Sequence, residues 1–238
     1  TKAFPTWDLA QPFRYLAHNG EINTIRGNQN WRNAREGTLK SSLFGEDLNK
    51  LFPVMRTGTS DSARFDNALE FLHLAGRDLP QSMLMMIPEA WENDPTMTEE
   101  RRAFYEYYSC MMEPWDGPAS MCFSNGDGVG AVLDRNGLRP SRYVVTTDGL
   151  LVMGSEFGTL PIDPVDIEVK GRLEPGRMFY ADLEEGRIIE DEELKDRYIT
   201  RQPYKTWVDM HQLKLGDLGS VDAVHKPNPE IRLSLQQT

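Results

Sequence analysis

The pattern of apolar residues changes near Gly117, and this change limits which folds the chain can adopt. Before this point apolar residues recur at helical spacing. After it, short β-branched or alternating runs follow one another closely, separated by turns that contain glycine. Helices in one block and hairpin strands in another predict an α+β fold with largely antiparallel sheets. The clearest helical face consists of Phe65, Ala68, Leu69, Leu72 and Ala75.

The same patterns predict individual elements. Met83, Met85 and Met86 lie in one short helix and are expected to fill the core rather than to form a surface for a partner. The expected helices cover residues 23–37, 61–75, 81–87, 101–112 and 191–198, the first with Ile25, Trp31 and Ala34 as its anchors. The expected strands cover residues 13–18, 119–123, 128–133, 143–147, 150–153, 177–182 and 187–190.

Composition excludes several classes of function. The 238 residues include 37 acidic and 26 basic side chains, for a formal net charge of −11, which opposes binding to nucleic acid. No apolar run is long enough to span a membrane, and no signal-peptide pattern is present. The two cysteines, Cys110 and Cys122, imply no disulfide framework and are expected to be small core residues. A reducing compartment fits best, either the cytoplasm or a plastid stroma.

The histidines do not indicate a metal site. All four are scattered, and no group of His, Cys and Asp has the spacing of metal ligands. His18 is expected to be an ordinary strand residue with a satisfied ring rather than a base. The glycine-rich stretch 126–130 leads into a strand instead of a helix, so it predicts a turn and not a dinucleotide site.

The stretch 15–23 carries the strongest chemical signal. An apolar strand leads into Asn19-Gly20, a dipeptide that favours a tight turn because both residues tolerate positive φ. Such a turn places an amide side chain beside an unhindered backbone N–H. Two rigid donors of this kind are what an acyl-transfer site needs to stabilise an oxyanion.

Several motifs together resemble one family. The stretch 4–28 is similar to the glutaminase domain of the glutamate synthases, which belongs to the class II glutamine amidotransferases within the N-terminal nucleophile hydrolases. Further similar segments are Ser60–Ala63, Ile87–Trp91, Asp116–Ala119 and Asp134–Pro140, and the likeness extends to about Trp207. The resemblance implies an αββα sandwich that is incomplete at its N-terminus. It also implies an amidotransferase domain at residues 1–207 and a linker at 208–238 towards a following domain.

The resemblance assigns roles to individual residues. Asn19 and Gly20 match the oxyanion-hole pair, through the Asn side-chain amide and the Gly backbone N–H. Asp61 matches the carboxylate that binds the α-ammonium of glutamine, although a helix N-cap is an alternative that Ser60 or Ser62 could also supply.

Two further residues are expected at the same pocket. By comparison with the asparagine synthetase branch, Glu21 adds to the ammonium site, and a plain surface charge is the alternative. Thr1 aligns with a threonine that follows the arginine binding the substrate carboxylate, so it belongs to the edge of the substrate pocket. The block Asp134–Pro140 borders the cleft in the family, and we expect it to give structural support.

The family's nucleophile is an N-terminal cysteine whose own α-amino group acts as the base. Position 1 is Thr1, so the chain is expected to be an internal fragment that hydrolyses no glutamine alone. The parent would release ammonia from L-glutamine for reductive amination of 2-oxoglutarate, in an FMN-binding synthase domain that also has an iron–sulfur cluster. Its electron donor would be a small NADPH-binding subunit or ferredoxin. No cofactor or metal is expected within this segment.

Two alternatives remain at this stage. One is another class II amidotransferase, such as an asparagine synthetase, against which the 134–140 block argues. The other is a non-catalytic amidotransferase-like scaffold.

Overall fold

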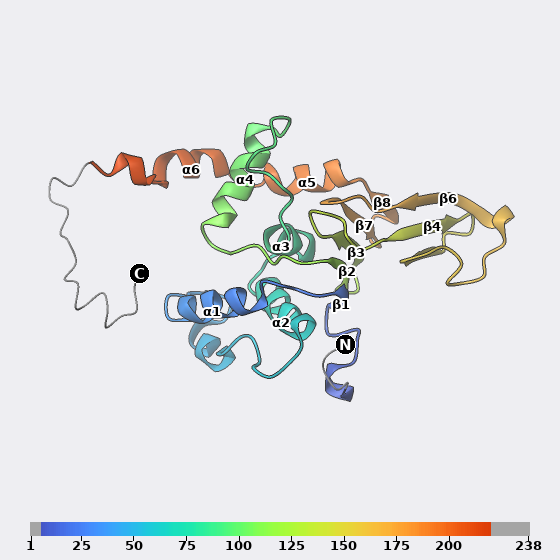
Figure 1. Cartoon of the computed structure of the whole chain (residues 1–238), viewed down its shortest axis with the longest axis horizontal. Helices are drawn as coiled ribbons and strands as arrows, with labels where there is room; N and C mark the ends of the chain where they lie inside the picture. Colours follow the sequence, from blue (N-terminus) through green and yellow to red (C-terminus); the bar gives the residue numbers. More distant parts are fainter. Residues whose placement is uncertain (1–5, 220–238) are drawn as a thin grey trace, which may run out of the picture.

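Residues 6–219 are described by the computed structural model, which has two antiparallel sheets and a set of helices (Figure 1). The helices are α1 (Ile25–Glu36), α2 (Asp61–Leu74), α3 (Leu79–Met86), α4 (Glu99–Ser109), α5 (Asp191–Ile199) and α6 (Tyr204–His211). The strands are β1 (Leu16–Gly20), β2 (Ala119–Ser124), β3 (Gly128–Leu133), β4 (Arg142–Thr146), β5 (Leu151–Gly154), β6 (Ile167–Arg172), β7 (Met178–Asp182) and β8 (Arg187–Ile189).

The larger sheet has five strands in the order β1-β2-β3-β7-β8, so β1 is an edge strand. Its side chains alternate between two apolar clusters, as the period of a strand requires. On β2, Met121 and Phe123 belong to the cluster shared with the helices, whereas Cys122 packs with the other cluster. On β7, Met178 belongs to the cluster shared with the helices and Phe179 to the other cluster. The sheet is therefore covered on both faces.

The second cluster joins the larger sheet to the smaller one, whose order is β5-β4-β6. Tyr143 of β4 meets Phe179 of β7 with ring centroids 4.8 Å apart, and Leu151 and Met153 of β5 pack beside them. The layers are thus helix, sheet and sheet, which confirms the predicted α+β class. They correspond to three of the four layers of the αββα sandwich.

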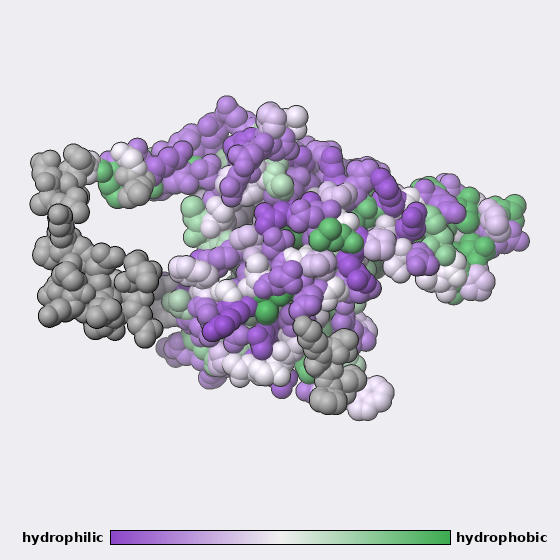
Figure 2. Space-filling view, in the orientation of Figure 1, coloured by the Kyte–Doolittle hydropathy of each residue, from purple (hydrophilic) through white to green (hydrophobic). Residues whose placement is uncertain are grey.

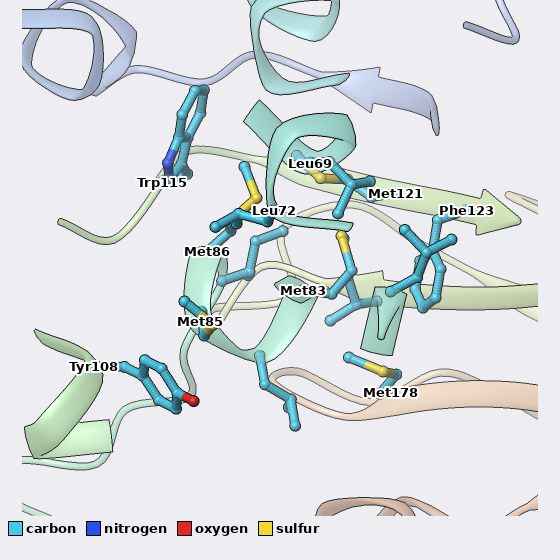
Figure 3. Close-up of a cluster of buried hydrophobic side chains, with 14 of the residues drawn as sticks. Leu69, Leu72, Met83, Met85, Met86, Tyr108, Trp115, Met121, Phe123 and Met178 are labelled. Carbon is cyan, nitrogen blue, oxygen red and sulfur yellow. The ribbon is translucent and has the colours of Figure 1, made fainter. Parts of the chain in front are cut away.

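Methionine fills much of the core between the helices and the five-stranded sheet (Figure 3). Met83 and Met86 of α3 are fully buried, and Met85 is 5% exposed. They pack with Leu69 and Leu72 of α2, which lie on the apolar face expected for that helix. The prediction that the methionines are core residues is confirmed.

A buried carboxylate fixes α2 against β1. Asp66 is 3% exposed, and its side chain accepts hydrogen bonds from the backbone N–H groups of Tyr15 at 2.9 Å and Leu16 at 3.0 Å. Two charge-assisted hydrogen bonds to the edge strand hold the helix in one position. Because Asp61 is the first residue of the same helix, its position relative to β1 is fixed as well.

The expected anchors of α1 are partly wrong. Ile25 packs on the core, but Trp31 is 55% exposed and Ala34 is also exposed. The buried residue is Asn28, whose side-chain amide donates to the carbonyl of Pro114 at 3.1 Å. The helix is held by polar contacts with the segment before β2, which apolar periodicity cannot reveal.

Other boundaries also differ from those expected. Strand β6 was not predicted, because most of its residues are exposed and its pattern is polar. Helix α4 begins at Glu99, two residues before the expected start at 101, and Thr98 caps it by accepting from the N–H of Arg101. Helix α6 continues past position 207 to His211, so regular structure extends beyond the expected domain boundary. That boundary and the linker stay predictions, and residues 220–238 lie outside the described part.

Hydrophilic side chains cover most of the face shown in Figure 2. Figure 2 shows apolar surface at the far end of the smaller sheet, and the exposed apolar residues of β6 and of the connection before it include Leu160, Val165 and Val169. Among residues 6–219 no helix has both the length and the apolarity that a bilayer span requires.

Candidate functional site

The residues of the candidate site lie on the outer edge of β1. Asn19 and Gly20 were expected to form a tight turn after the strand, and this is wrong: they belong to β1 and are paired with Ser120 and Ala119 of β2. The chain leaves the sheet only after Gly20, where the N–H of Glu21 donates to the carbonyl of Pro118 at 3.0 Å. Two rigid donors beside each other are nevertheless present, on a strand instead of a turn.

The backbone at Gly20 can be adopted only by glycine. Its φ is +151°, and a Cβ atom placed there would lie 1.9 Å from the carbonyl oxygen of Pro118. Gly117 has the matching constraint, because its Cβ would lie 2.0 Å from the carbonyl oxygen of Glu21. The two segments therefore lie in direct backbone contact, which fixes the direction of the Gly20 N–H.

We expect Gly20→Ala to lower the free energy of unfolding by about 1–3 kcal/mol, because the new methyl group displaces the segment at Pro118. Gly27→Ala is the matched control: nothing lies within 4 Å of a Cβ there, and the residue is inside α1. That variant should be more stable by up to about 1 kcal/mol. Urea unfolding of both variants measures the difference, and equal stability of the two would contradict the close approach at Gly20.

Alternation along β1 shows where the Gly20 N–H points. In an antiparallel ladder successive N–H groups face opposite edges. The N–H of Leu16 donates to Asp66 at 3.0 Å, and that of Ile22 donates to Asp61 Oδ2 at 2.8 Å, both on the edge away from β2. The N–H of Gly20 lies between them on this edge, and no side-chain acceptor is assigned to it within residues 6–219. It is a free, fixed donor.

Asp61 is close to this donor. Its carboxylate binds the N–H of Ile22, two residues beyond Gly20, and two residues of extended chain span about 7 Å. This distance is comparable to the length of an extended glutamine from its carboxamide to its α-amino group. The helix cap is supplied by Ser60, which accepts from the N–H of Ala63 at 3.2 Å, so Asp61 does not serve as the cap. Its other carboxylate oxygen has only a long contact, 3.5 Å from Ser62 Oγ.

Asn19 is exposed, and its carboxamide oxygen accepts a hydrogen bond from Arg139 Nη2 at 2.6 Å. The amide NH₂ is then directed away from Arg139 and is free to donate. Nothing in the spacing of the sequence connects positions 19 and 139, so this contact could not be predicted.

The remaining expected site residues differ in what the structure shows. Glu21 is exposed and next to Ile22, and no side-chain partner is assigned to it in the described part of the chain. Thr1 lies outside the described residues. The cavities described in this structure are lined by other residues than Asn19, Gly20 and Asp61, which we call the rim.

His18 lies just behind the rim and is 7% exposed. Its Nδ1 is 2.8 Å from Ser62 Oγ and 3.9 Å from Asp61 Oδ2, and its Nε2 is buried without a partner among the described residues. Burial lowers the pKa of this imidazole; the charge of Asp61 raises it and that of Arg139 lowers it. His18 is therefore a neutral supporting residue at physiological pH, although one ring nitrogen lacks the partner that the sequence led us to expect.

A lowered pKa for His18 predicts acid sensitivity. Below about pH 6.5 the unfolded chain binds a proton that the folded one does not, so stability present above this pH is lost as the pH falls. We expect the free energy of unfolding to fall between about pH 7.5 and 5.5 by at most about 1.4 kcal/mol per pH unit from this group. In His18→Gln this part of the pH dependence should vanish; an unchanged slope in urea titrations would contradict the assignment.

Neither cysteine is placed as a nucleophile for this rim. Cys122 is partly buried against the second apolar cluster, and burial raises the pKa of its thiol, which disfavours the reactive thiolate. Cys110 was expected in the core, and this is wrong: it is exposed just after α4, where its thiol contacts the carbonyl of Glu106 at 3.4 Å. No cluster of three or more His, Cys, Asp or Glu suited to a metal occurs between residues 6 and 219.

Comparison with known proteins shows the family of the chain. The family model for class II glutamine amidotransferases matches residues 1–207. Glutamate synthase [NADPH] large chain of Bacillus subtilis is 49% identical over 232 residues, which are 98% of this chain and 15% of that protein. Glutamate synthase [NADH] of Schizosaccharomyces pombe is 50% identical over 92% of this chain and 10% of its own length.

A plant protein is similar to the same extent. Ferredoxin-dependent glutamate synthase 2, chloroplastic, of Arabidopsis thaliana is 47% identical over 87% of this chain and 13% of its own length. The chain thus spans only 10–15% of the length of these relatives. With the family model matching most of its residues, the chain belongs to the class II glutamine amidotransferases.

Proposed function

We propose that this chain is the glutaminase part of a glutamate synthase, in which L-glutamine is hydrolysed to glutamate and ammonia. The observation that carries the proposal is the arrangement of three groups at the edge of β1. The Gly20 N–H and the Asn19 amide lie there, and two residues beyond Gly20 the N–H of Ile22 binds the carboxylate of Asp61. This arrangement matches a substrate with a reacting carboxamide at one end and an ammonium group at the other. The identity to named glutamate synthases supports the same substrate.

Each residue then has a defined task. The ammonium group of glutamine donates to Asp61, which selects an amino acid over a simple amide. The Gly20 N–H and the Asn19 NH₂ bind the carboxamide oxygen as it gains negative charge during nucleophilic attack. Glu21 adds negative charge beside the ammonium group, and Thr1 belongs to the carboxylate end of the pocket.

The nucleophile and the arginine for the substrate carboxylate are supplied by the parent polypeptide upstream of this segment. Attack by an N-terminal thiolate gives a thioester and releases ammonia, and water then releases glutamate. We further propose that the parent passes ammonia to an FMN-binding synthase domain with an iron–sulfur cluster. Its electrons come from an NADPH-binding subunit or from ferredoxin, and the protein works in the cytoplasm or a plastid stroma.

The test compares this 238-residue chain with the complete polypeptide that carries it. Both are supplied with L-glutamine, and ammonia is measured by an enzyme-coupled assay. We expect steady ammonia release from the complete polypeptide and none from the chain alone. Full activity should also remain when Cys110 and Cys122 are both replaced by serine. Ammonia release from the isolated chain, or none from the complete polypeptide, would overturn the proposal.

A further inference from the structure

We propose that Arg139 is a positioning residue for glutamine hydrolysis: it holds the Asn19 carboxamide so that its NH₂, and not its oxygen, faces the reacting carbonyl. The inference rests on the proposed function of the site. It gives the 134–140 block, which the sequence left as structural support, a definite part in catalysis.

The contact itself determines the orientation of the amide. A guanidinium group can only donate, so the atom of Asn19 that lies 2.6 Å from Arg139 Nη2 must be the oxygen. A planar carboxamide held by its oxygen directs both N–H bonds elsewhere. Without this partner an exposed asparagine could rotate and present its oxygen to the oxyanion, which would repel it. Arg139 therefore stabilises the productive one of the two orientations of the Asn19 carboxamide, the one with its NH₂ towards the oxyanion.

The loop that carries Arg139 is built to be rigid. Asp134 is 2% exposed, and its carboxylate accepts from the N–H groups of Asn136 at 3.0 Å and Leu138 at 3.2 Å. The N–H of Gly137, whose φ is +60°, donates to the carbonyl of Asp134 at 2.9 Å. These bonds fix the direction in which the chain enters position 139.

The same carboxylate also connects the loop to the oxyanion strand. Asp134 accepts from the N–H of Ala119 at 3.1 Å, and Ala119 is the residue paired with Gly20. The Asp134 side chain thus sets the position both of Arg139 and of Ala119, the residue paired with Gly20. It therefore supports both oxyanion donors, Asn19 through Arg139 and Gly20 through Ala119.

Arg139 also contributes charge. Its Nε is buried and has no hydrogen-bond partner among the described residues, and its Nη2 donates to the neutral carboxamide of Asn19. A cation behind the carboxamide polarises it and makes its N–H bonds stronger donors. This effect grows as negative charge develops on the substrate, so it should appear in kcat more than in KM.

The experiment uses the complete polypeptide with four variants: Arg139→Met, Arg139→Lys, Asn19→Ala and the double variant of Arg139→Met with Asn19→Ala. Arg135→Met is the matched control, because Arg135 lies in the same loop but pairs with Asp116 at the surface. We expect Arg139→Met to lower kcat about 10–100-fold with KM changed less than about threefold. Arg139→Lys should lower kcat less than Arg139→Met does. The kcat of Arg135→Met should stay within about threefold of the wild-type value.

The double variant separates positioning from general support. If Arg139 acts through Asn19, its removal should cost almost nothing once Asn19 is alanine, so the double variant should equal Asn19→Ala. A kcat unchanged in Arg139→Met, or losses that multiply in the double variant, would overturn the inference. Should Arg139→Met fail to fold, Arg139→Lys with and without Asn19→Ala gives the same comparison. Inactive wild-type polypeptide would overturn the proposed function as well, whereas active wild type with an unaffected Arg139→Met overturns this inference alone.

Discussion

Replacing Asn19 by alanine in the complete polypeptide is expected to lower kcat for glutamine hydrolysis by about 10²–10³-fold, because one of two oxyanion donors is lost. KM should change little, since the amide strengthens its bond mainly when charge develops. Asn19 is exposed at the end of an edge strand, so the fold should tolerate the truncation. Initial rates of ammonia release over a range of glutamine concentrations give both constants.

The matched control for this variant is Asn33→Ala. Asn33 is also an exposed asparagine, but it lies on α1 away from the rim. Its replacement should leave kcat within about threefold of wild type, as expected for a surface substitution outside the site. If Asn19→Ala were as active as Asn33→Ala, the edge of β1 would not be an oxyanion hole.

The largest expected loss of stability comes from a buried charge. Lys195 of α5 is fully buried, and its ammonium group lies 3.1 Å from Glu89 Oε2, 2.9 Å from Asp191 Oδ2 and 3.1 Å from the carbonyl oxygen of Gly176. Lys195→Met removes the cation shared by these carboxylates, although Glu89 keeps Arg101 at 3.5 Å and Asp191 keeps Arg177 at 2.7 Å. Removing one partner of a buried ion pair is strongly destabilising, and the remaining partners offset part of that cost, so we expect the free energy of unfolding to fall by about 3 kcal/mol.

Lys205→Met is the control for this change. Lys205 of α6 also lies near two carboxylates, but its side chain is 49% exposed and water screens the pairs. Exposed pairs contribute about 0–1 kcal/mol, so this variant should be nearly as stable as wild type. Urea unfolding of both variants at one pH measures the change in the free energy of unfolding that each replacement causes. Equal effects of the two replacements would mean that Lys195 is better hydrated than the structure indicates.

The parts of the fold that the sequence could predict are those set by local periodicity. The apolar face of α2 and the methionines of α3 were recognisable because a buried helix needs apolar residues at fixed spacing. Strand β6 and the polar anchor Asn28 were not, because their positions are fixed by partners distant in the chain. The exposure of Cys110 had a different cause: its neighbours in sequence are aromatic, but helix α4 ends there and the thiol is exposed.

For the site, the sequence by itself determined the chemical groups: an amide followed by a glycine after a strand, and a carboxylate at the start of a helix. Short-range rules are enough for this, because they depend on which side chains and which backbone freedom a residue has.

Only the tertiary structure decided how these groups meet. Pairing with β2 turned an expected turn into a strand end with a free N–H, and Asp61 reached that edge by bonding Ile22. Arg139 lies 120 positions from Asn19 along the chain and meets it because Asp134 bonds the backbone opposite Gly20. Hydrogen bonds between distant segments leave no periodic trace in the sequence, so their geometry appears only when the chain is folded.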